Sequence, residues 1–114
     1  MSEASFLNFD SAEYIMIEDL IETIQTLKKD IEFNIPIIDT EIDSMIKNKE
    51  KSSQNIEKML DTLLDYLSLG VGEDQFIKLN SYYRSICPEY SAEYNGFYQE
   101  IIEKQVLRVL SRNY

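Results

Sequence analysis

The stretch IEDLIETIQTLKKDI, residues 17–31, places apolar side chains three and four positions apart. The members of this series are Ile17, Leu20, Ile24, Leu27 and Ile31. Because an α-helix completes a turn in about 3.6 residues, this spacing collects them on one helical face. The same rhythm continues through Ile35, Ile38, Ile42 and Met45, and returns at Ile56, Met59, Leu63 and Leu67. The half of the chain from Asp10 to Leu69 is therefore predicted to be helical.

Local signals set the limits of the first helices. Asp10 begins a capping pattern that predicts a helix from about Ser11. Pro36 lacks an amide hydrogen, and its ring disfavours helical geometry in the residue before it. We therefore expect the first helix to end near Phe33 and a second to begin near Ile37, with one kinked helix as the alternative.

The nine residues from Lys47 to Asn55 contain no apolar side chain, and two interpretations compete there. An unbroken seven-residue phase without glycine or proline favours one helix over 37–69, about 50 Å long at about 1.5 Å per residue. A compact domain of this length has a radius of gyration of roughly 13 Å, so such a rod would protrude. We expect a turn near Lys51–Ser53 instead.

The second half of the chain is predicted to form two further helices. Gly70 can take the left-handed conformation that closes a helix, and Glu73 begins the next one. Pro88 ends that helix and suits the first position of the last, which runs to about Arg112. Residues 1–9 are expected to form an arm that packs its aromatic side chains on the helices. The predicted fold is an all-α, single-domain bundle of four to five helices, possibly including one long helix.

Length and composition bound the class of protein. A chain of 114 residues suits one domain, residues 1–114. No apolar run approaches the roughly 20 residues of a membrane-spanning helix, and the first residues do not resemble a signal peptide. The single cysteine, Cys87, cannot close an intrachain disulfide, which agrees with a reducing compartment. We expect a cytoplasmic protein.

The absence of histidine from the sequence removes several chemistries. It excludes Ser-His and Cys-His nucleophiles and the Glu-x-x-His pairs with which helical bundles hold two irons. The acidic series Asp39, Glu41 and Asp43 lacks the glycine and closing glutamate of a calcium loop. Gly70 and Gly72 lack the remaining parts of a phosphate loop. We expect no catalytic residue, no metal and no cofactor, and hence no enzyme.

The placement of charge indicates what the chain binds. Residues 1–46 hold eleven acidic and two basic residues, a formal charge of −9 out of a total of −10. Such a surface repels nucleic acid and anionic membranes and attracts basic proteins. The leading hypothesis is a non-enzymatic acidic protein-binding module, a small inhibitor of the immunity, antitoxin or antagonist type, with a basic protein as its partner. Direct binding to nucleic acid or a membrane is not expected.

Tyrosine is the second compositional signal, because five of the eight lie between residues 82 and 98. Tyrosine is common at binding hot spots, although rings at this spacing also pack one helix on another. The predicted protein-binding residues are Glu18, Glu22, Asp39, Asp43, Tyr82, Tyr83, Tyr90, Tyr94 and Tyr98. The alternative hypothesis is a structural or homo-oligomeric subunit, a homodimer for example, in which the faces of 17–31 and 38–67 pair between chains.

Overall fold

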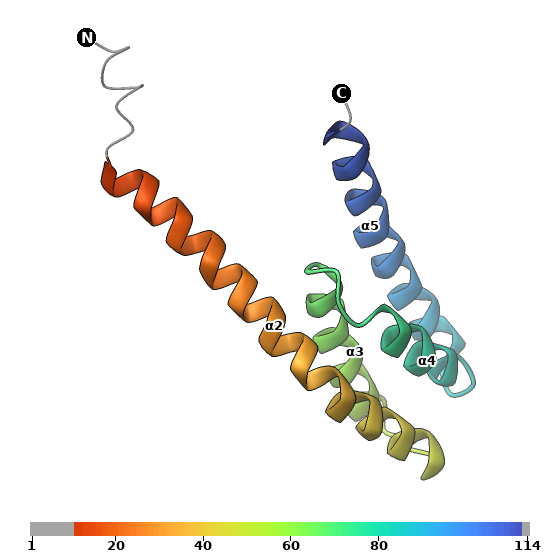
Figure 1. Cartoon of the computed structure of the whole chain (residues 1–114). Coiled ribbons are helices and arrows are strands. Elements are labelled where there is room, and N and C mark those ends of the chain that lie inside the picture. Colours follow the sequence, from red (N-terminus) through yellow and green to blue (C-terminus); the bar gives the residue numbers. More distant parts are fainter. Residues whose placement is uncertain (1–10, 113–114) are drawn as a thin grey trace.

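The chain forms a bundle of α-helices joined by short loops. A computed structural model describes residues 11–112 (Figure 1). Its helices are α2 (Ser11–Lys47), α3 (Ser53–Leu67), α4 (Glu73–Arg84) and α5 (Pro88–Arg112). The described range contains no strand, so the all-α prediction is confirmed. The expected arm of residues 1–9 lies outside the described residues.

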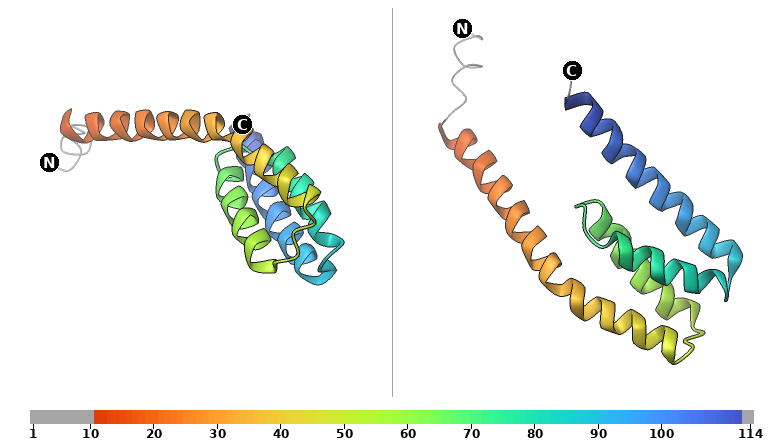
Figure 2. Two further views of the ribbon diagram at one scale, coloured as in Figure 1. Left: turned by 90° about the horizontal axis from the view of Figure 1, so that it is seen from below. Right: turned by 45° about the vertical axis from the view of Figure 1, so that its right-hand side comes forward.

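Helix α2 continues through Pro36, so the predicted end near Phe33 and restart near Ile37 are wrong and the kinked alternative holds. The helix bends part-way along (Figure 2). Pro36 supplies a cause, since it cannot donate to the carbonyl four residues earlier and its ring crowds that carbonyl. The Thr40 hydroxyl also donates to the Pro36 carbonyl oxygen over 2.9 Å, a contact that favours bending.

The polar stretch after α2 forms the predicted turn. The left-handed backbone of Lys49, with φ of 55°, reverses the chain. Ser52 caps α3, because its hydroxyl oxygen accepts a hydrogen bond from the Asn55 amide at 3.3 Å. The helix pair α2 and α3 is therefore joined by residues 48–52, and the alternative of one helix over 37–69 is excluded.

The core lies between the second half of α2 and the other three helices. Helix α4 contacts α2, α3 and α5. The buried residues of the core are Ile38, Ile42, Ile56, Leu60, Leu63, Leu67, Phe76, Leu79, Tyr83 and Tyr94. The apolar face of 38–67 therefore packs within its own chain, and the hypothesis of pairing between chains stays a prediction for the face of 17–31.

The first part of α2 extends away from this core (Figure 2). Here the α2 arm means residues 11–34 of α2. Every residue from 17 to 30 is exposed, and the next residue, Ile31, is buried, with 7% of its surface accessible. The molecule measures 65 × 27 × 24 Å with a radius of gyration of 19.1 Å. That radius exceeds the roughly 13 Å of a compact domain of this length, so the molecule is elongated.

The loop between α3 and α4 contains two glycines with positive φ, and they differ in surroundings. Gly70, at φ of 77°, has open space where a Cβ would lie. Gly72, at φ of 89°, would bring a Cβ within 3.3 Å of Leu63 Cδ2. Because Leu63 is fully buried, it has little room to move away.

Substitution of these glycines by alanine tests the loop. Gly70→Ala should cost about 1 kcal/mol, because an L-residue in the left-handed region is strained by roughly 1–2 kcal/mol. Gly72→Ala should cost about 2 kcal/mol or more, since the same strain is joined by the contact with Leu63. Urea denaturation of both variants measures the difference, and equal losses would contradict the packing of this loop.

Candidate protein-binding surface

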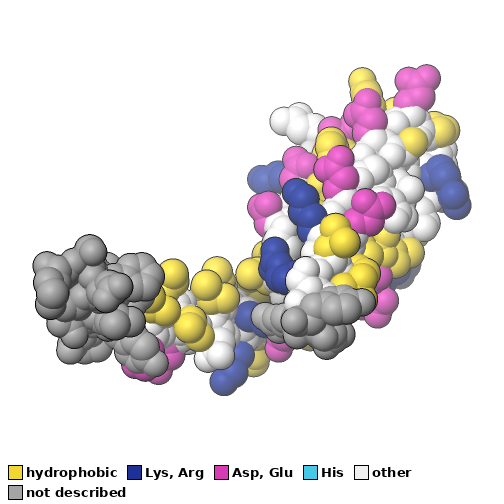
Figure 3. Space-filling model, turned by 90° about the horizontal axis from the view of Figure 1, so that it is seen from above, with side chains coloured by type: hydrophobic (Ala, Val, Ile, Leu, Met, Phe, Trp, Pro, Cys, Tyr) yellow, Lys and Arg dark blue, Asp and Glu magenta, His cyan; other side chains and the backbone are white. Residues whose placement is uncertain are grey.

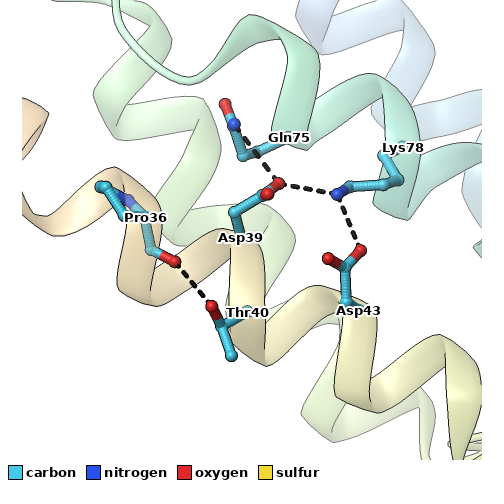
Figure 4. A network of polar contacts seen from close by, with 6 residues as sticks. All are labelled: Pro36, Asp39, Thr40, Asp43, Gln75 and Lys78. Atoms are coloured by element: carbon cyan, nitrogen blue, oxygen red, sulfur yellow. Dashed lines mark hydrogen bonds and ion pairs between the residues drawn. The ribbon is translucent and has the colours of Figure 1, made fainter.

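Asp39 and Asp43, two of the predicted binding carboxylates, are engaged within the chain. The Lys78 ammonium donates to Asp39 Oδ1 at 2.7 Å and to Asp43 Oδ1 at 2.8 Å (Figure 4). Gln75 Nε2 adds a longer bond of 3.4 Å to Asp39. The hydrogen bond from Lys78 holds the pKa of Asp39 below its ordinary value, and the two carboxylates raise the pKa of Lys78. These groups tie α2 to α4, so they offer a partner less free charge than the sequence suggests.

Tyr83 and Tyr94 belong to the core, because both are buried and their rings meet edge to face. The Tyr83 hydroxyl donates to the Glu57 carboxylate. The Tyr94 hydroxyl donates to Asp61 Oδ1 at 2.7 Å. Burial of each ring, followed by its carboxylate partner, raises the pKa of both phenols, that of Tyr83 to about 12. Neither ring presents a surface to a partner, so the role predicted for them in binding is corrected to a role in packing.

The other three predicted binding tyrosines, Tyr82, Tyr90 and Tyr98, differ in their surroundings. The half-buried Tyr82 donates to the backbone oxygen of Glu50 at 2.7 Å, which fixes the loop after α2. Tyr98 stacks on Phe76 with ring centroids 5.4 Å apart, and its hydroxyl donates to Glu73 at 2.6 Å. That hydrogen bond and partial burial raise the pKa of Tyr98. Tyr90 is exposed near the start of α5.

The largest exposed apolar feature of α2 lies on its arm. The apolar stripe consists of Ile17, Leu20, Ile21, Ile24 and Leu27, whose exposed fractions lie between 45% and 59%. In helical phase the stripe continues directly into the buried side chains Ile31, Ile38 and Ile42. It therefore lies on the side of α2 that faces the bundle, and Figure 3 shows hydrophobic side chains along this inner edge.

The predicted carboxylates Glu18 and Glu22 are exposed on the α2 arm, together with Asp19. Their helical positions place them away from the apolar stripe, on the other side of the same turns. The arm thus has one apolar and one acidic side in its first described turns. Of the predicted binding residues, these two carboxylates are the ones that lie on the α2 arm.

A second group of exposed apolar side chains lies at the end of α5. Val106, Leu107 and Leu110 are each about half exposed. Gln105 Nε2 donates to the Leu67 carbonyl oxygen at 2.6 Å, and this bond anchors α5 beside the end of α3. The residues that follow Gln105 continue past that anchor. From periodicity alone, these residues and the stripe would be assigned to a core. The structure shows that no other part of the described chain covers them.

A shallow hollow between α4 and α5 is lined in part by Asn80, Ser91 and Tyr98. Its buried polar atoms are already paired: Asn80 Nδ2 donates to the Ser91 carbonyl oxygen at 3.1 Å, and the Ser91 hydroxyl lies 3.0 Å from the Asn80 carbonyl oxygen. Residues 11–112 contain no cluster of three potential metal-ligating side chains of the His, Cys, Asp and Glu types. The apolar stripe is therefore the better candidate for a functional surface.

Comparison with protein families, curated proteins and solved structures finds no significant match. No helix in the described part of the chain is long and apolar enough to cross a membrane.

The buried phenol of Tyr83 predicts a loss of stability at high pH. Because its pKa rises from 10.0 to about 12 on folding, the folded state holds this proton more tightly. The resulting stabilisation is complete below pH 10 and is lost as the pH rises through about 12. The free energy of unfolding, measured by urea denaturation at several pH values, should therefore fall across this window.

Tyr83→Phe supplies the control, since it keeps the ring and removes the ionising hydroxyl. At neutral pH it should cost about 1–2 kcal/mol, because the half-buried Glu57 loses its hydrogen-bond donor. Its stability should then depend less steeply on pH than that of the unmodified chain over the same window. An unchanged slope would show that Tyr83 does not carry this dependence.

Proposed function

We propose that the chain is a non-enzymatic protein-binding module that docks through the apolar stripe of the α2 arm. The observation behind the proposal is a row of five aliphatic side chains, each about half exposed, on a helix that extends beyond its own core. Scattered apolar residues are normal on a protein surface, but a contiguous row is typical of interaction sites. The row is also presented on a regular helix, so binding orders few additional groups.

The narrower proposal of a small cytoplasmic inhibitor of a basic protein draws support from the acidic side of the arm. Glu18, Asp19 and Glu22 are exposed on the other side of the turns that carry the stripe, so they can steer a basic partner toward the arm. This proposal expects an association rate that falls steeply as salt rises. Asp39 and Asp43 contribute less, because Lys78 lies between them.

Site-specific photo-crosslinking in the cell of origin tests the docking surface. A photoreactive residue at position 24 lies in the stripe, whereas one at position 26 lies on the opposite side of the same helical turn. Position 24 should give crosslinked protein adducts and position 26 should give few, because only the first faces a bound partner.

The mass of the adducts identifies the kind of partner. A mass of two chains indicates a second copy, and any other mass indicates a different protein. Adducts at neither position, or at both equally, would contradict the proposal that the stripe is a docking surface.

A further inference from the structure

We propose that the occupant of the apolar stripe is the α2 arm of a second copy, lying antiparallel across a two-fold axis. This inference rests on the broader proposed function, docking through the stripe, and it names a second copy in place of the basic partner of the narrower proposal. A two-fold pair uses one patch on both chains, so the patch must be complementary to itself. The sequence and position of the stripe meet this requirement.

The stripe has the residue pattern of a coiled-coil seam. Isoleucine occupies residues 17, 24 and 31, seven apart, and leucine occupies residues 20 and 27 between them. This alternation gives the a and d positions of a heptad repeat, which pack into a facing helix of the same kind. Such a seam is built to meet another helix rather than a flat or basic surface.

The direction of pairing follows from the position of the bundle. The stripe continues into Ile38 and Ile42, so the bundle lies on the stripe side of α2. In a parallel pair, each bundle would project toward the partner helix at the same end, and the two bundles would occupy the same space. In an antiparallel pair the bundles lie at opposite ends. Each bundle then flanks the first turns of the partner's arm.

The register is set by which seam residues remain exposed. If Ile17 faces Leu27 of the other copy, then Leu20 faces its Ile24, and all four exposed seam residues are used. The fifth seam residue, Ile31, is left out of this pairing and is already buried within its own chain. In this register Ile21 lies beside its counterpart near the two-fold axis and adds to the contact.

The end of α5 completes the interface. The stripe from residue 17 to 27 is only about 15 Å long, which is short for a stable coiled coil by itself. Val106, Leu107 and Leu110 are exposed at the end of α5. Figure 1 shows that α5 and the α2 arm extend from the same end of the bundle, so a second arm beside the first would lie next to the end of α5. These side chains widen the apolar surface that the second arm covers.

Charge is complementary in this arrangement. The first turns of the arm carry Glu18, Asp19 and Glu22, all exposed. The end of α5 carries Lys104 and Arg108, with no acidic residue from 104 to 111. Antiparallel pairing brings the acidic turns of one copy toward the basic end of α5 in the other, twice per dimer.

The oligomeric state of the full chain tests the inference. Sedimentation equilibrium should show a dimer, and Leu20→Glu should raise its dissociation constant by about 100-fold or more, because each dimer loses two buried leucines. Thr26→Glu introduces the same charge on the opposite side of the arm and should leave the dimer unchanged. Leu20 and Thr26 are both exposed in the single chain, so urea denaturation of the two variants should give the same stability at a protein concentration low enough that both are monomeric.

Cysteine crosslinking tests the direction, with Cys87→Ser as the background. Ile17→Cys combined with Leu27→Cys should form disulfides between two chains, whereas Ile17→Cys alone should not. The two positions lie about 15 Å apart on one helix, so they cannot join within a chain. Efficient crosslinking through position 17 alone would indicate a parallel pair and would overturn the inference.

Failure of this inference is distinguishable from failure of the proposed function. A chain that stays monomeric, or a dimer that Leu20→Glu does not weaken, overturns the second copy as the occupant. Adducts from position 24 with a different protein would then still support the stripe as a docking surface.

Discussion

Burial of Ile38 and Ile42 against the other helices is the contact on which the rest of the structure depends. These residues lie in the same core as Leu60 and Leu79, so they fix the second half of α2 to the bundle. Lys78 reinforces this attachment by bridging two carboxylates of α2. Partly exposed ion pairs of this kind contribute only about 0.2–1 kcal/mol, so apolar burial dominates. With its second half held and its middle bent, α2 directs its arm away from the core.

The acidic and tyrosine-rich composition has a structural explanation. Several tyrosines place their rings in or against the core while their hydroxyls donate to carboxylates at its edge. The pairs are Tyr83 with Glu57, Tyr94 with Asp61, and Tyr98 with Glu73. A buried phenol needs such a partner, because an unpaired hydroxyl in the interior costs about 1–3 kcal/mol. Acidic residues of α3 and α4 therefore serve packing as well as solubility, and part of the composition that suggests binding is used in folding.

Much of the fold is predictable from local signals, and the exceptions arise from tertiary contacts. The starts of α4 at Glu73 and of α5 at Pro88 agree with the acidic first turn of α4 and with the preference of proline for the first helical position. The helix break predicted at Pro36 is wrong. A proline inside a helix costs about 3 kcal/mol locally, but Ile31 and Ile38 are buried on either side of it. Their burial can offset that local cost. The helix is therefore bent rather than ended.

The sequence by itself determines the helical class, the apolar periodicity and the placement of charge, because these depend on residue type and spacing along the chain. Only the tertiary structure decides which part of a periodic face is covered. Ile42 and Leu27 belong to the same series, but the first is fully buried and the second is half exposed. Likewise Tyr83 and Tyr90 have the same side chain and different roles. The reason is physical: burial depends on which helices pack against a residue, and periodicity within one helix contains no information about its neighbours.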